Sequence, residues 1–348
     1  MRTGVLGGVG LRVGAIFLAL AFTTGVLLLA DAPPLEAYRQ IVIGSIGSVK
    51  KITDVLVAWV PLVLVTSGLL ITFAAGLWNI GIEGQITLGA IFTTGALRLA
   101  LGSDVPPALA IAVAILSGIV GGALWALLAG LLKAYGGVNE IFGGLGLNFV
   151  AVALNVWLIF GPWGRPGVAS MSGTEPFPDS FSLPALADLR LSPWAVVLAI
   201  GGFALVYFLL KGTYFGLRLK AVGKNPRAAF VLGVPTVRYM LLAFILCGGL
   251  GGAAGAVQVT AVYHRLIPAI SSGYGYLGLM VAMLVNYQPT WVPVVAFFFA
   301  ALNIGSIQLP IVLKLDSSLA GVLQGALVLF VLGVEGLRRR RPVVKATE

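Results

Sequence analysis

The sequence contains very little charge. Only 10% of its 348 residues are Asp, Glu, Lys or Arg, and 59% are hydrophobic. Soluble domains carry about 25% charged residues. A chain this poor in charge cannot cover itself with a surface that suits water, so we expect its solvent to be a lipid bilayer.

The chain has one cysteine, Cys247, and one histidine, His264. A single cysteine excludes a disulfide within the chain and a thiolate metal cluster. His264 has no nucleophile motif near it, which disfavours catalysis. The sequence also lacks a G-x-x-x-x-G-K-[ST] phosphate-binding loop, so we expect no nucleotide, metal or other cofactor on this chain. The Gly-rich run "GGLGGAAG" lies inside an apolar segment and predicts helix packing.

What is present is a series of apolar runs. A membrane-spanning helix needs about 20 apolar residues. The sequence predicts an all-α, polytopic membrane protein that forms one transmembrane domain, with a signal-peptide-like N-terminus that we interpret as a retained first span. The ten predicted spans lie near residues 12–30, 54–74, 80–101, 106–132, 140–161, 193–211, 237–258, 272–287, 290–307 and 316–334.

The net charge of +10 comes from basic residues between these runs. No soluble basic domain is present to bind nucleic acid, so we interpret the charge as a topology signal. With both termini in the cytoplasm, fourteen of the 22 Lys and Arg residues lie inside. They are Arg2, Arg12, Lys133, Lys211, Arg218, Lys220, Lys224, Arg227, Arg238, Arg338, Arg339, Arg340, Arg341 and Lys345.

This orientation divides the chain into further segments. Residues 162–192 form a long outer loop, which either caps an outer mouth or is a plain connector. Residues 213–235 form an inner loop, and residues 335–348 form a basic cytoplasmic tail. The blocks 54–161 and 237–334 each hold four spans and run in opposite senses, as the two halves of an inverted repeat would.

Several polar or aromatic residues lie within or beside the spans. Glu83 is costly at membrane depth, so we expect it to face protein or water, either on a substrate path or in a structural role at a helix break. Asn139 is a candidate helix cap or path residue, Asn148 a candidate interhelical or path residue, and Tyr274 and Tyr276 candidate stacking or interfacial residues. The full set of candidate path residues is Trp78, Asn79, Glu83, Gln85, Asn139, Asn148, Tyr274 and Tyr276.

The inner loop has a distinctive pattern. "GLRLKAVGKNPRAAFVLG" predicts a short helix, a break at residues 223–226, and a second short helix that Asn225 caps. Small residues and cations together favour docking of a soluble partner, and a loop resting on lipid head groups is the alternative. The candidate coupling residues are Gly216, Arg218, Gly223, Asn225, Arg227, Ala228, Ala229 and Gly233.

Four motifs along the chain resemble those of a known protein family and occur in the same order. The inner loop resembles the coupling-helix region of ABC importer permeases of the branched-chain amino acid, ribose and nucleoside class. "WNIGIEGQ", "GGVNEIFGGLGLN" and "SSGYGYLGLMVAMLV" resemble further segments of the nucleoside and simple-sugar subgroup. The leading glutamate of the loop in other ABC permeases is Arg227 here, and Asn286 and Tyr287 stand where relatives often have Gly-Arg.

The resemblance implies a non-catalytic permease subunit in a bacterial or archaeal plasma membrane. It also implies three kinds of protein partner: cytoplasmic ATPases that use the ATP, a second permease, and an extracytoplasmic substrate-binding protein. The first alternative is an ion-coupled secondary transporter with Glu83 as proton carrier. The second is an intramembrane enzyme, which would need a catalytic constellation that the spans lack.

Overall fold

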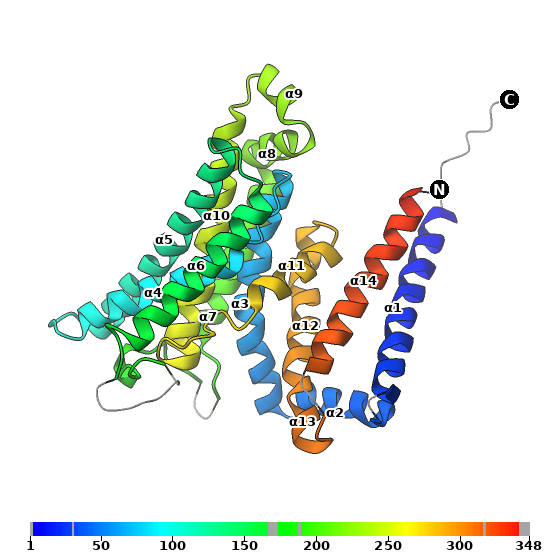
Figure 1. Ribbon diagram of the computed structural model, residues 1–348, viewed down its shortest axis with the longest axis horizontal. Helices are drawn as coiled ribbons and strands as arrows, with labels where there is room; N and C mark the ends of the chain where they lie inside the picture. Colours follow the sequence, from blue (N-terminus) through cyan, green and yellow to red (C-terminus); the bar gives the residue numbers. More distant parts are fainter. Residues whose placement is uncertain (1–2, 30, 166–172, 187–188, 316–317, 341–348) are drawn as a thin grey trace. The chain divides into compact units, whose positions relative to one another are not determined.

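The computed structural model describes residues 3–29, 31–165, 173–186, 189–315 and 318–340, and helices without any strand form the described part (Figure 1). Parts of the predicted outer loop, at 166–172 and 187–188, and the predicted tail from residue 341 lie outside the described residues. The helices are α1 (Thr3–Leu29), α2 (Pro34–Ile46), α3 (Val49–Ala74), α4 (Ile82–Ala100), α5 (Pro107–Ala134), α6 (Glu140–Phe160), η1 (Asp179–Phe181), α7 (Pro193–Gly212), α8 (Tyr214–Lys224), α9 (Pro226–Val231), α10 (Thr236–Val257), the π-helix η2 (Gln258–Tyr263), α11 (Tyr274–Leu284), η3 (Pro289–Trp291), α12 (Val292–Ser306), α13 (Gln308–Val312) and α14 (Ser318–Arg340).

Six helical segments of the described chain are long and apolar enough to cross a membrane, and a bent pair raises the number to seven. The six are Val49–Ala74, Pro107–Ala134, Glu140–Phe160, Pro193–Gly212, Thr236–Tyr263 and Pro289–Val312. Each overlaps one of the ten predicted spans. The all-α membrane class is therefore confirmed, whereas the count of ten is not.

The other four predicted spans correspond to shorter, bent or more polar helices. α4 carries Glu83 and Gln85 in its first turn and Arg98 in its last turn, which lowers its hydropathy. α11 has only 11 residues, because Asn286 and Tyr287 follow it with left-handed φ angles of 49° and 60°. The apolar part of α14, Gly321–Gly333, is also short. The first predicted span is part of the bent pair, Phe17–Leu29 with Pro34–Ile46, whose axes differ by 112°.

The chain forms two compact units. The small unit comprises residues 1–55 and 298–348, and the large unit comprises residues 56–297. In the small unit α1 lies beside α14, where Phe22 contacts Phe330, and α2 packs against α13 (Figure 1). α2 was not predicted, and Pro34 in its first turn favours its start. The predicted division into spans and blocks remains a prediction.

Glycines allow the helices at the centre of the large unit to pack closely. A Cβ atom on Gly252 of α10 would collide with the carbonyl oxygen of Gly118 in α5, and one on Gly89 of α4 would collide with the Gly252 backbone. Such contact brings backbones together, as is common between helices in membranes. The predicted packing role of the Gly-rich run in α10 is thus confirmed.

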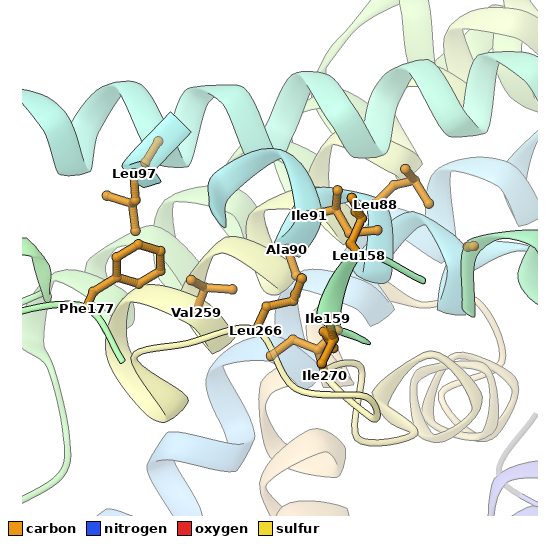
Figure 2. Packing of buried hydrophobic residues seen from close by; sticks show 12 residues of the cluster. Leu88, Ala90, Ile91, Leu97, Leu158, Ile159, Phe177, Val259, Leu266 and Ile270 are labelled. Carbon is orange, nitrogen blue, oxygen red and sulfur yellow. The ribbon is translucent and has the colours of Figure 1, made fainter. Parts of the chain in front are cut away.

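At the end of the large unit opposite α8 and α9, the chain folds over η2. Phe177 of the long loop lies with Leu97 and Val259 in a buried apolar cluster (Figure 2). Backbone hydrogen bonds add to this cluster, since Phe177 N–H donates to His264 O (2.8 Å) and Leu183 N–H donates to Thr260 O (2.8 Å). The described part of the loop is therefore a packed structure and not a loose connector.

Candidate functional site

The chain is not helical between α3 and α4, and the polar residues of "WNIGIEGQ" surround this break. Asn79 and Gln85 exchange two amide hydrogen bonds, Asn79 Nδ2 to Gln85 Oε1 at 3.0 Å and Gln85 Nε2 to Asn79 Oδ1 at 2.9 Å. Asn79 Nδ2 also lies 3.1 Å from Cys247 Sγ of α10. Both amides are 1% exposed. This reciprocal pair satisfies polar groups that would be costly if they were buried alone.

Glu83 binds the N-terminus of another helix. It is 6% exposed, and its Oε2 accepts a hydrogen bond of 2.7 Å from Gly275 N–H in the first turn of α11. The Ser271 hydroxyl and the N–H groups of Gly273 and Tyr276 lie close to the same carboxyl group. The first N–H groups of a helix have no partner within it, and the helix dipole favours an anion there. Glu83 therefore acts as a cap for α11, although it belongs to α4.

Asn148 of α6 caps the N-terminus of α4 in a similar way. Its Oδ1 accepts from Gly84 N–H at 2.7 Å, and its Nδ2 donates to Ile80 O at 2.9 Å. Asn148 is 3% exposed. The N-terminus of α4 is thus capped from α6 while α4 itself caps α11, so the three helices are linked by side chains that satisfy helix ends.

This polar cluster, which comprises Asn79, Glu83, Gln85 and Asn148, lies deep in the large unit. Asn148 is near the middle of α6, and a Cβ atom on Gly251, near the middle of the span Thr236–Tyr263, would meet Ile82 and Gln85. Two helix N-termini, those of α4 and α11, meet at this depth. An arrangement of this kind is typical of transporters with discontinuous helices, whose ends line a substrate site.

The other predicted path residues lie outside the cluster. Asn139 is exposed and caps α6, because its Oδ1 accepts from Ile141 N–H at 2.9 Å. Tyr274 is 8% exposed, whereas Tyr276 and Trp78 are 44% and 37% exposed. Trp78 packs edge-on against Phe73 with ring centroids 5.2 Å apart.

Sequence analysis missed two buried groups near these residues. Sequence analysis considered Cys247 only as a disulfide partner or metal ligand, yet its Sγ lies 3.1 Å from Asn79 Nδ2. Asn155 of α6 is fully buried, and its Nδ2 donates to the carbonyls of Ile267 and Pro268, both at 3.0 Å. An asparagine inside the apolar run of residues 140–161 was the available signal.

The inner loop has the predicted helix–break–helix form. Thr213 caps α8 by accepting from Gly216 N–H at 3.1 Å, and Asn225 caps α9 by accepting from Ala228 N–H at 3.0 Å. Gly233 ends the second helix with a φ of 79°. Both helices lie at one end of the large unit (Figure 1).

The exposed surface of this loop differs from the predicted small-residue face. Ala228 is exposed, but Ala229 is 2% exposed and Gly216 is buried, so the latter two cannot contact a partner. At the end of α9 three consecutive apolar side chains are exposed, Phe230, Val231 and Leu232, at 68%, 84% and 80%. We call these three residues the apolar tip.

The sequence is similar to those of known transport proteins. The family described as "Branched-chain amino acid transport system / permease component" matches residues 51–332. The glucose ABC transporter permease protein TsgB13 of Haloferax volcanii is 29% identical over 95% of this chain and 89% of its own length. The guanosine ABC transporter permease protein NupP of Bacillus subtilis is 24% identical over 93% of both chains.

A further relative and one solved structure are also similar to this chain. The nucleoside ABC transporter permease protein NupB of Lactococcus lactis is 25% identical over 78% of this chain and 77% of its own. Among solved structures, PsaBC from Streptococcus pneumoniae in complex with Fab has 13% identity and a TM-score of 0.49 over 85% of this chain and 95% of that chain, a likeness too low to support an argument. The family match, with the apolar helices, shows that the chain belongs to the permease components of the branched-chain amino acid transport type and is a non-catalytic, multi-pass membrane subunit of an ABC importer.

Proposed function

We propose that the chain forms part of the translocation path for a nucleoside or a related small, sugar-containing solute. The observation that carries the proposal is the polar cluster where the N-termini of α4 and α11 meet at mid-depth. A nucleoside presents hydroxyl groups and ring nitrogens that need hydrogen-bonding partners along an apolar path. The substrate class is supported by relatives named as nucleoside, guanosine and glucose permeases.

The geometry favours a scaffolding role for the polar cluster over tight substrate binding. Glu83, Asn79, Gln85 and Asn148 already use their polar atoms on one another or on helix ends. The path would then receive its cargo from an extracytoplasmic binding protein and hold it weakly. Trp78 and Tyr276 retain exposed aromatic surface with which a base or sugar ring could stack.

The proposal includes the partners that drive the cycle. One of two cytoplasmic ATPases binds the apolar tip and the exposed Ala228, and a second permease completes the path. Arg218 and Arg227 are exposed and steer the docking. The remaining predicted features, ten spans in two inverted blocks with both termini in the cytoplasm, belong to this proposal.

Uptake by the reconstituted complex tests the proposal. Proteoliposomes that contain the permease, its ATPase and its binding protein are supplied with labelled guanosine, uridine, glucose and leucine. We expect ATP-dependent uptake of the nucleosides, with competition by unlabelled nucleoside and not by leucine. Uptake that needs no ATPase and collapses with the proton gradient would instead establish the ion-coupled alternative.

A further inference from the structure

Three aromatic side chains meet at the end of the large unit that carries the inner loop. Phe73 lies in the last turn of α3, Trp78 in the connection to α4, and Tyr287 just beyond α11. The ring centroid of Phe73 is 5.2 Å from that of Trp78 and 5.1 Å from that of Tyr287, both in edge-on geometry. Aromatic pairs prefer this geometry, so the three rings join α3, the helix break and α11.

Tyr287 reaches Phe73 through an uncommon backbone. Asn286 and Tyr287 have φ angles of 49° and 60°, a left-handed conformation that few residues other than glycine adopt. This turn ends α11, and Tyr287 N–H donates to Ala282 O at 3.4 Å. Backbone conformations of this kind persist where the surroundings enforce them and often mark functional segments.

The inner loop contacts the same segment directly. Gly223 of α8 lies against the connection that follows Phe73. A Cβ atom on Gly223 would collide with Ala74 O and would lie 2.9 Å from Gly76 N, and Gly76 has a φ of 72°. The backbones of the two segments therefore touch with no side chain between them. Close-packed contacts of this kind transmit displacement because they cannot be compressed.

We propose that Phe73, Trp78 and Tyr287 form an aromatic latch through which the inner loop moves α11, and that motion enters at the Gly76–Gly223 contact. The proposal rests on the proposed function, because it requires an ATPase to act on the inner loop. α11 is held at its other end by Glu83, so a displacement at Tyr287 reaches the polar cluster through one rigid helix. The latch residues are positioning residues, and none of them belongs to the apolar tip.

The first experiment substitutes the contact glycine. Gly223→Ala places a methyl group against backbone atoms, whereas Gly212→Ala, at the end of α7, adds one where no atom lies within 4 Å. We expect Gly223→Ala to co-purify with the ATPase as the unaltered chain does, but to lower substrate moved per ATP hydrolysed by about ten-fold, within the range seen for residues that carry coupling. Gly212→Ala should leave both measurements unchanged.

The second experiment tests the rings. Tyr287→Leu should uncouple ATP hydrolysis from uptake to a similar degree, and Tyr287→Phe should restore coupling because it keeps the ring. The double variant Phe73→Leu/Tyr287→Leu should be no worse than Phe73→Leu alone, since that single change already removes the contact with Tyr287.

Co-purification with the ATPase and the amount of substrate moved per ATP distinguish the ways in which the proposal can fail. Loss of ATPase binding in Gly223→Ala would assign this glycine to the docking surface and overturn its role in transmission. Full coupling in Tyr287→Leu, or additive defects in the double variant, would overturn the latch. Neither result would contradict the proposed function as part of an ATP-driven importer. Uptake by the unaltered complex without ATP would refute the proposed function itself.

Discussion

Glu83 shows how a carboxyl group is accommodated at membrane depth. Its hydrogen-bond partner is Gly275 N–H at the start of α11, with the Ser271 hydroxyl nearby, so no second charged side chain is needed. The charge costs several kcal/mol in a bilayer unless it is matched in this way. The same contact fixes where α11 begins, so the structural role that the sequence offered for Glu83 extends to a helix far away in the chain.

We predict that Glu83→Ala lowers uptake strongly. Each buried N–H group left without a partner costs about 1–3 kcal/mol, so α11 should lose its position and uptake should fall by about ten-fold or more. Glu83→Gln, which keeps an acceptor oxygen, should have an intermediate effect. Initial rates are compared at matched membrane levels with Asp104→Ala, a change in the exposed turn after α4. Equal rates for Glu83→Ala and Asp104→Ala would contradict the capping role.

At the scale of elements, α9 is a helix of six residues that ends in exposed apolar side chains. A short helix with such a surface is stable only because caps and a neighbour support it. Asn225 and Pro226 define its start, and the buried Ala229 anchors it to the rest of the loop. The element is therefore a rigid support for the apolar tip.

We predict that the apolar tip contributes strongly to the affinity for the ATPase. Phe230→Ala should weaken the complex by about 1.4 kcal/mol or more, which is roughly ten-fold in affinity, because buried aromatic anchors dominate interfaces. Phe208→Ala of α7 is the matched control, since Phe208 is 65% exposed and Phe230 is 68% exposed. The measurement is the affinity for purified ATPase in detergent. Similar losses for both variants would show that the tip does not dock.

Two companion changes complete this prediction. Ala228→Trp should disrupt docking by adding bulk to the interface, where overpacking costs about 1–3 kcal/mol. Neutralising Arg218 and Arg227 should have a smaller effect that high salt removes, since exposed charges mainly steer association. If Ala228→Trp assembles with the ATPase and couples normally, the inner loop is not the segment that contacts the ATPase.

The packing of α10 against α5 gives a second prediction at this scale. Gly252→Ala should lower the stability of the purified permease by about 1–3 kcal/mol, because the added methyl group meets backbone atoms that cannot move away. Gly201→Ala of α7 is the control, as no atom lies within 4 Å of its position. Thermal unfolding in detergent provides the comparison. An unchanged midpoint for Gly252→Ala would mean that the helices separate at little cost.

At the scale of the whole molecule, charge and family membership describe a multi-pass membrane subunit. We predict its orientation from the distribution of Lys and Arg, which are concentrated in the inner loop and in the described end of α14. The opposite orientation would expose the apolar tip on the outside, where no ATPase could bind it.

Cysteine labelling tests the orientation. In a Cys247→Ala background, Lys224→Cys should resist an impermeant thiol reagent applied to intact cells and react once the membrane is opened. Asp104→Cys, in the turn between α4 and α5, should react from outside. Ready labelling at position 224 in intact cells would overturn the topology.

The sequence by itself determined the membrane class, the family and the helix–break–helix form of the inner loop. These properties follow either from short sequence patterns or from totals over the whole sequence, such as its charge. Low charge and apolar runs require a bilayer, Asn225 and Pro226 start a helix wherever they occur in this pattern, and ordered motifs identify relatives. No knowledge of which helices touch is needed for any of them.

Only the tertiary structure decided the partners of Glu83 and Asn148 and the surface of the inner loop. Glu83 meets Gly275, which is 192 positions away in the chain. Ala228 and Ala229 are adjacent and chemically identical, yet one is exposed and the other is buried. Helix caps that come from another helix, and the side of a short helix that faces inward, depend on packing between distant segments, which local sequence patterns do not encode.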